Sequence, residues 1–108
     1  MNNTEITFAK GTLFIKLYGD IDHHTAKFTR EEIDREIYKY NPKTVVMELS
    51  AVDFMDSSGL GLILGRYSKI NLLGGILKVA NPTERIEEML LMAGTNKIIP
   101  IEKGVKYI

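Results

Sequence analysis

Cysteine is absent from this chain of 108 residues. Its absence excludes disulfide bonds, metal sites built on thiolates and catalysis by a cysteine nucleophile. A chain without cysteine suits a reducing compartment, and we expect this protein to act in the cytoplasm. The first residues are polar and form no apolar signal segment, which agrees with that expectation.

An excess of one charge is also missing. The 14 basic and 14 acidic residues cancel, so the chain lacks the net positive charge on which nucleic-acid affinity depends. Apolar runs are only a few residues long, far below the roughly 20 residues that span a bilayer. We therefore expect no direct binding to nucleic acid and no insertion into a membrane. The length fits a single domain covering residues 1–108.

Histidine is scarce, and the chain has only His23 and His24. Adjacent residues do not share a helix face, and no cysteine or third histidine could complete a zinc site. The motifs G-x-S-x-G and G-x-x-x-x-G-K-[ST] are absent, and the Gly-Leu-Gly at 59–61 lacks the third glycine of a dinucleotide fingerprint. The sequence thus predicts a protein that is not an enzyme and has no metal and no cofactor. The alternative is a small serine hydrolase using Ser57 with His23 or His24, if their loops share one end of the sheet.

Alternating apolar residues and turn signals predict an α/β fold with a small mixed β-sheet. The expected order is β-β-α-β-α-β-α-β, in which the first two strands form an antiparallel hairpin and the later strands pair in parallel through helical crossovers. Amphipathic helices should pack against this sheet in two layers. The expected strands are residues 6–8, 13–18, 44–49, 76–80 and 97–101, and the first two expected helices are residues 25–40 and 57–73.

Helix ends can be predicted from capping residues. Asp22 or Thr25 could supply the N-cap oxygen of the first helix. One glycine of Gly74-Gly75 should end the second helix in the left-handed conformation. Asn81, followed by Pro82 and by a Glu three residues after the Asn, predicts the cap of a third helix that ends at Gly94. Pro100 suggests that the last strand lies at an edge of the sheet.

Side-chain positions follow from the same periodicities. The expected core includes the hairpin residues Ile6, Phe8, Leu13, Ile15 and Leu17, the first-helix stripe Ala26, Ile33, Ile37 and Tyr40, and the third-helix stripe Ile86, Met89, Leu90 and Ala93. Phe54 and Met55 are expected in the core rather than in a docking patch. Arg66 and Lys69 should lie on a solvated face. Close approach of another backbone would explain the glycines at 59, 61 and 65 in the second helix.

The most informative stretch runs from Val52 to Gly61 and joins a predicted strand to a predicted helix. It places the two hydroxyls of Ser57 and Ser58 at a helix N-terminus, after Asp56 and before Gly59. Backbone N–H groups without an intrahelical partner point outward there, and the helix dipole favours negative charge. Such a place can be an ordinary cap, a cradle for an anion or a site of phosphorylation, and these residues alone do not choose between the two serines.

Phosphorylation at this place would make the chain a switch. A phosphoserine carries roughly −1.5 to −2 charges, which the helix N-terminus tolerates, so the fold should survive. Two unit charges about 4 Å apart interact by about 4 kcal/mol at an effective dielectric near 20. A hundredfold loss of affinity needs only about 2.7 kcal/mol, so one clash with a partner carboxylate would be enough.

Three segments resemble a known family: Tyr18 through Ala26, Val52 through Tyr67, and Gly74-Gly75. Within them stand Asp-His-His-Thr-Ala, Met-Asp-Ser-Ser-Gly-Leu-Gly and Leu-Gly-Arg-Tyr. These motifs resemble the anti-sigma factor antagonists, or anti-anti-sigma factors, of spore-forming bacteria, which belong to the STAS domain family. The resemblance covers essentially the whole chain and implies a STAS-like fold, a small mixed sheet with helices packed against it.

The resemblance also implies a partner-switching function of the sporulation sigma-F type. The unphosphorylated protein would bind an anti-sigma factor that is also a serine kinase carrying adenine nucleotide, and would so release sigma factor F. Phosphorylation of Ser57, the first serine of the motif, would switch binding off, and a membrane-associated serine phosphatase would restore it. An antagonist of a general-stress sigma factor is the alternative within the family.

Two groups of residues match the family segments that lie at the partner surface. The first is the loop that holds Asp20, Asp22, His23, His24 and Thr25. The second is the helix start formed by Asp56, Ser57, Ser58, Gly59, Leu60 and Gly61. By resemblance, all of these are candidates for partner binding, and Ser57 is the candidate phosphoacceptor.

Overall fold

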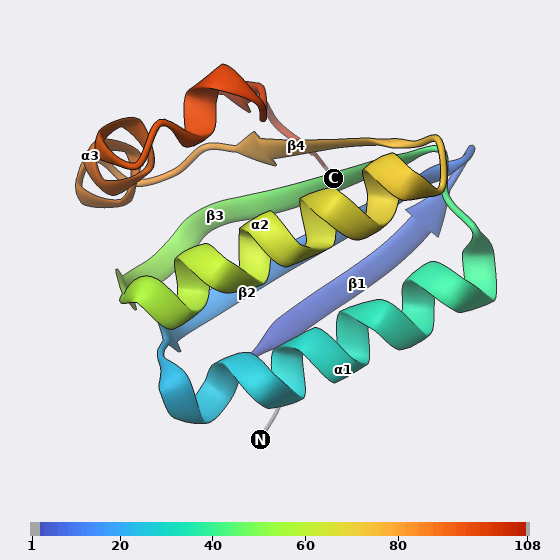
Figure 1. Cartoon of the computed structure of the whole chain (residues 1–108), viewed down its shortest axis with the longest axis horizontal. Coiled ribbons are helices and arrows are strands. Elements are labelled where there is room, and N and C mark those ends of the chain that lie inside the picture. Colours follow the sequence, from blue (N-terminus) through green and yellow to red (C-terminus); the bar gives the residue numbers. More distant parts are fainter. Residues whose placement is uncertain (1–2, 108) are drawn as a thin grey trace.

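The computed structural model describes residues 3–107 of the chain. They form one sheet of five strands, and α1 and α2 lie side by side across one of its faces (Figure 1). The strands are β1 (Thr4–Ala9), β2 (Thr12–Ile21), β3 (Thr44–Met55), β4 (Ile76–Ala80) and β5 (Ile101–Glu102). The helices are α1 (His23–Tyr40), α2 (Ser57–Leu72), α3 (Glu84–Met92) and the short 3-10 helix η1 (Thr95–Lys97). The predicted α/β fold and order of elements are confirmed, with η1 added before the last strand.

The sheet is mixed, as predicted. β1 pairs antiparallel with β2, and the remaining neighbours pair in parallel in the order β2-β3-β4-β5. The β1–β2 turn is tight, with both Lys10 and Gly11 at positive φ. β5 lies at the edge, where Pro100 was expected to place it. In the parallel part of the sheet, formed by β2 to β5, the helices that follow the strands all begin at the same end of the sheet, and this decides where the functional residues gather.

The core lies between the sheet and the layer of α1 and α2. Leu13, Ile15 and Leu17 alternate along β2 and are fully buried, which follows from the period of two of a strand covered on one face. Their partners are alternate residues of β3 and β4 together with residues of the helices, among them Ile33, Ile37, Ile63 and Ile70. Tyr40, expected in the core, is instead 37% exposed and stacks on Phe8 with ring centroids 4.4 Å apart.

β3 is longer than predicted, and so is β2. β3 was expected to end at Leu49 but continues to Met55, because Val52 and Met55 supply further buried residues and Ile21 of β2 pairs with Met55. The ladder is irregular between Lys16 and Tyr18 and again beside Gly19, whose φ is +68°. These shifts hide the alternation that marks a regular strand in the sequence.

The C-terminal part differs most from prediction. Thr83, not Asn81, caps α3, since its hydroxyl accepts the N–H of Ile86 at 3.3 Å. Asn81 has a left-handed backbone, and its amide group contacts Glu48 and the backbone of Val105. The strand predicted at 97–101 is reduced to Ile101–Glu102, because the chain turns through η1 with Ile98 and Ile99 donating to the carbonyl of Thr95. Ala93 of the predicted stripe is exposed, while Ile86 and Leu90 are buried.

None of the helices within residues 3–107 combines the length and the apolar character that crossing a bilayer requires.

Candidate functional site

The two segments singled out in the sequence meet at one end of the sheet. β2 and β3 are adjacent and parallel, with Ile21 opposite Met55, so the residues that follow them emerge together. The N–H of Asp56 donates to the carbonyl of Ile21 at 3.3 Å and ties the two strand ends. α1 and α2 therefore both begin here (Figure 1), and their N-termini present positive dipole ends to the same surface.

Asp22 caps α1 through a capping box. Its carboxylate accepts the N–H groups of His24 at 2.9 Å and Thr25 at 3.1 Å, and its own N–H donates to the hydroxyl of Thr25 at 2.9 Å. The Thr25 hydroxyl in turn donates to the carbonyl of Asp20 at 3.0 Å. Of the two alternatives for the cap, Asp22 is the N-cap and Thr25 is its reciprocal partner. The hydrogen bond from Thr25 holds the pKa of Asp22 below its ordinary value near 3.8, and that from His24 acts in the same direction.

The lowered pKa of Asp22 predicts a specific acid sensitivity. A carboxyl whose pKa is lower in the folded state stabilises fully above its unfolded pKa, and this contribution is lost as the pH falls through the folded value. We expect Asp22→Asn to be less stable than the wild type at pH 7, because Asn caps without the charge that favours the dipole, and the difference should begin to shrink near the ordinary pKa of 3.8 and vanish only once the pH has fallen through the lower folded pKa. Urea unfolding of both proteins, repeated from pH 7 down to the acid range, measures this difference in the free energy of unfolding. Asp53→Asn, which removes a nearby carboxylate that caps no helix, is the control, and a difference that persists at low pH would contradict this account.

Asp56 caps α2, so the side chain of Ser57 is not needed to cap the helix. The Asp56 carboxylate accepts the N–H of Ser58 at 2.8 Å, and its carbonyl accepts the N–H groups of Gly59 and Leu60. Ser57 is the first residue of the helix and is exposed, whereas Ser58 is half-buried. Within residues 3–107 no hydrogen bond to the Ser57 hydroxyl is formed. Exposure therefore distinguishes the two serines, which the sequence alone did not, and it favours Ser57 as the group that an incoming active site can reach.

The glycines of α2 differ in their surroundings, and the expected approach of another backbone is wrong. A Cβ on Gly59 would lie 2.1 Å from Cγ of Met55, so Gly59 is required by a buried side chain. A Cβ on Gly61 or on Gly65 would meet nothing within 4 Å. Leu60, the remaining residue of the predicted motif, is half-buried and packs against the core.

An acidic hollow of about 540 Å³ lies beside the α1 N-terminus. Asp20, Asp22 and Thr25, predicted for partner binding, line it together with Asn3, Tyr18, Gly19 and Asp53. Tyr18 and Asp53 were missed as site residues. The sequence prediction ended β3 at Leu49 and so did not place Asp53 on the strand. In the structure β3 continues, Asp20 of β2 pairs with Phe54, and Asp53 is therefore brought close to Asp20.

Phe54 and Met55 differ in burial. Met55 is 2% exposed and belongs to the core, as expected. Phe54 is 40% exposed, so its expected burial is wrong. Successive residues of a strand point to opposite faces, and only one of this pair can reach the covered face. Phe54 thus adds an exposed aromatic ring near the end of β3.

His23 and His24 are both exposed at the start of α1. Their rings contact each other with centroids 5.8 Å apart. The loops do share one end of the sheet, and His23 lines a hollow together with Ser58. Among the described residues, however, neither histidine is hydrogen-bonded to a serine, and a nucleophile with its base is not assembled. No group of three His, Cys, Asp or Glu residues suited to a metal ion occurs between positions 3 and 107.

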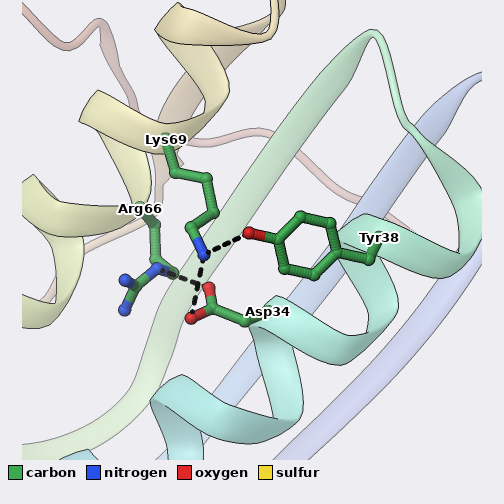
Figure 2. A network of polar contacts seen from close by, with 4 residues as sticks. All are labelled: Asp34, Tyr38, Arg66 and Lys69. Atoms are coloured by element: carbon green, nitrogen blue, oxygen red, sulfur yellow. Dashed lines mark hydrogen bonds and ion pairs between the residues drawn. The ribbon is translucent and has the colours of Figure 1, made fainter.

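Arg66 and Lys69 reach from α2 to α1 (Figure 2). Arg66 Nε lies 2.9 Å from Oδ1 of Asp34 as an ion pair without hydrogen-bond alignment, and Lys69 Nζ lies 3.3 Å from Oδ2. Lys69 Nζ also donates to the hydroxyl of Tyr38 at 3.1 Å. The expected solvated face is wrong for Arg66, which is only 6% exposed. Its role depends on the contact between α1 and α2, which the periodicity of a single helix does not reveal.

Three comparisons with known proteins agree on the family to which this chain is related. The family model described as the STAS domain matches residues 3–107. The anti-sigma F factor antagonist of Paenibacillus polymyxa is 40% identical over 97 residues, which are 90% of this chain and 83% of that protein. The solved structure of the anti-sigma factor antagonist SpoIIAA in its unphosphorylated form matches with a TM-score of 0.83 and 25% identity, over 95% of this chain and 89% of that chain. The solved structure of the Bacillus cell fate determinant SpoIIAA in its phosphorylated form matches with a TM-score of 0.77 and 25% identity, over 95% of this chain and 92% of that chain.

Proposed function

This chain belongs to the STAS domain family, and on that premise we propose that it is an anti-sigma factor antagonist of the sporulation sigma-F type. In its unmodified form it binds an anti-sigma factor that is also a serine kinase, and so frees sigma factor F. The name of the Paenibacillus polymyxa relative supports the sigma-F assignment. The protein acts as a single STAS domain in the cytoplasm, which agrees with the absence of cysteine.

The observation that carries this proposal is the exposed hydroxyl of Ser57 at the first position of α2. The partner surface surrounds it and consists of the two helix starts that meet there: Asp20, Asp22, His23, His24 and Thr25 on one side, and Asp56, Ser58, Gly59, Leu60 and Gly61 on the other. The acidic hollow supplies carboxylates for basic side chains of the kinase, and the exposed ring of Phe54 supplies apolar area.

The modification is a phosphoryl transfer from ATP that the kinase carries. The Ser57 oxygen attacks the γ-phosphorus, a new O–P bond forms, the bond to the β-phosphate oxygen breaks and ADP leaves. The hydroxyl proton passes to a base of the kinase. The chain contributes a reachable nucleophile on a rigid helix start, and the kinase contributes the catalytic groups. A serine phosphatase reverses the change by adding water across the O–P bond.

Phosphate on Ser57 would change the surface rather than the fold. The helix dipole and the N–H groups of the first turn suit an anion, so α2 has no reason to unwind. The phosphorylated form of SpoIIAA keeps a fold that matches this chain, which supports the same expectation here. The added charge lies beside Asp56, the N-cap of the same helix, and it makes the exposed start of α2 more negative. A partner shaped for the hydroxyl then meets a group that is both larger and charged.

The test is to incubate the purified chain with the sporulation anti-sigma kinase and ATP and to locate the added phosphate by mass spectrometry. We expect one phosphate on Ser57, none on a Ser57→Ala variant and normal labelling of Ser58→Ala. Label on Ser58 alone, or on neither serine, would contradict the proposal. The kinase that controls a general-stress sigma factor serves as the comparison. Preferential labelling by that kinase would indicate that this chain is an antagonist of a general-stress sigma factor instead.

A further inference from the structure

A second hollow, of about 490 Å³, lies between the N-terminal halves of α1 and α2. We call it the basic hollow, because His23, Lys27 and Arg30 of α1 and Arg66 of α2 line it. The hydroxyl-bearing Ser58 also lines it, next to the proposed phosphoacceptor. No residue of the acidic hollow lines the basic hollow, so the two are separate features of the same end of the molecule.

Arg66 is a buried cation with an incomplete set of partners. Its side chain is 8% exposed, and within residues 3–107 it forms one ion pair, from Nε to Asp34. Its terminal nitrogen Nη1 is enclosed and has no hydrogen-bond partner within residues 3–107. Figure 2 shows both terminal nitrogens of Arg66 pointing away from Asp34, Tyr38 and Lys69. A buried donor without an acceptor is unfavourable. Arg66 lines the basic hollow, so an anion bound there would complement the charge of its guanidinium group.

The positive charges around the hollow are only partly compensated, because Asp34 pairs with Arg66 whereas Lys27 and Arg30 form no ion pair within residues 3–107. Burial lowers the pKa of the Arg66 guanidinium, Asp34 opposes this effect, and the positive charge of Arg30 lowers the pKa further. Arg30 is thus close enough to Arg66 for repulsion, and Asp34 already serves both Arg66 and Lys69. Two guanidinium groups that face one space are typical of sites for phosphate, which accepts paired N–H bonds from arginine.

Two glycines keep this space open. Gly61 and Gly65 of α2 line the basic hollow, and a Cβ on either would meet nothing within 4 Å. Glycine inside a helix is less stable than alanine, and no neighbour in the described chain requires it at these positions. Their absence of side chains lets a ligand approach the helix backbone closely.

From these observations we propose that the basic hollow binds a phosphate group, held by Arg30 and Arg66 with Lys27 and the Ser58 hydroxyl beside them. The phosphate has two possible sources. It is either free in solution, as inorganic phosphate or part of a small molecule, or it is the phosphoryl group on the neighbouring Ser57. Binding of free phosphate does not depend on the proposed function, because it requires neither the kinase nor the sigma factor.

The first test is a titration of the unmodified protein with sodium phosphate, followed by amide NMR shifts and by the thermal unfolding midpoint. Sodium chloride at matched ionic strength is the reference. We expect saturable shifts at residues 27, 30, 58, 61 and 65 and a higher midpoint with phosphate only. Arg30→Gln should weaken phosphate binding by about tenfold or more, since it removes a charged donor. Arg35→Gln makes the same change at an exposed position of α1 that does not line the hollow, and it should bind as the wild type does.

Equal shifts with chloride, or unchanged phosphate affinity in Arg30→Gln, would overturn the proposal. Asp34→Asn provides a further readout, because it removes the carboxylate that competes for Arg66, and it should bind phosphate more tightly than the wild type. Tighter binding supports the site, and weaker binding in a folded Asp34→Asn protein would count against it.

The second arm distinguishes the sources with protein phosphorylated on Ser57. If the phosphoryl group occupies the hollow, amide signals of Lys27, Arg30 and Arg66 shift on modification and added phosphate no longer binds. If those signals stay and added phosphate still binds, the natural occupant is a free or small-molecule phosphate. Both results retain the site, whose existence the titration of the unmodified protein decides.

Discussion

Ser57→Asp is expected to bind the anti-sigma kinase about a hundredfold more weakly than the wild type, with an unchanged unfolding midpoint. A carboxylate at this position adds charge where the proposed partner contacts an exposed hydroxyl. A hundredfold loss corresponds to about 2.7 kcal/mol, and a single repulsive contact at an interface supplies this amount. The fold should not suffer, because an acidic residue in the first turn of a helix is favourable to its dipole.

Ser68→Asp is the matched control for this experiment. Ser68 is an exposed serine on the same helix, more than two turns away from the α2 N-terminus. It receives the same charge and should bind the kinase normally. Isothermal titration calorimetry measures both affinities, and thermal unfolding verifies the fold. Tight binding by Ser57→Asp, or an equal loss in Ser68→Asp, would show that the α2 N-terminus is not the contact that phosphorylation controls.

Gly59→Ala and Gly65→Ala are expected to change stability in opposite directions. The Cβ at position 59 would overlap Cγ of Met55 at 2.1 Å, and Met55 is buried and cannot move into solvent. Overpacking of this kind costs about 1–3 kcal/mol. At position 65 the new methyl group meets open space, and the change from glycine to alanine inside a helix gains up to about 1 kcal/mol. The same chemical change on one helix thus separates packing from intrinsic helix preference.

Urea denaturation of the two variants measures this difference directly. A destabilised Gly65→Ala would mean that the hollow beside it is narrower than described, and a neutral Gly59→Ala would mean that Met55 repacks without cost. Gly65→Ala also narrows the basic hollow, so its phosphate affinity should fall while its stability rises. Such a divergence is typical of a residue kept for binding rather than for folding.

Local signals in the sequence were sufficient for most of the fold. The hairpin, the helix of Ser57–Leu72 and the strand Ile76–Ala80 follow from periodicity and from Gly and Pro signals, and Gly74 ends α2 at positive φ as predicted. The sequence did not predict the local structure correctly where contacts with residues distant in the chain determine it. Asn81 looks like a helix cap, yet its amide binds Glu48 and Val105 instead, and this tertiary contact moves the cap to Thr83.

The family was recognised from the motifs and is confirmed, but the site was predicted only in part. The sequence narrowed the cap of α1 to Asp22 or Thr25 and located the strand-to-helix junction at Asp56, because capping depends on neighbours within a few positions. Tyr18, Asp53 and the buried pair of Arg66 with Asp34 could not be predicted, since they depend on the register of β2 against β3 and on the contact of α1 with α2. The roles of the predicted partner-binding residues stay predictions.

At the start of α2, the helix cap and the proposed phosphorylation fall on different residues. Asp56 secures the helix, and the adjacent Ser57 contributes no hydrogen bond from its hydroxyl within residues 3–107. Replacing Ser57 would therefore leave the chain as well folded as before. Under the proposed function, the interaction with the kinase preserves that serine over generations and folding does not, so a lineage without the kinase would be free to lose this hydroxyl while keeping Asp56.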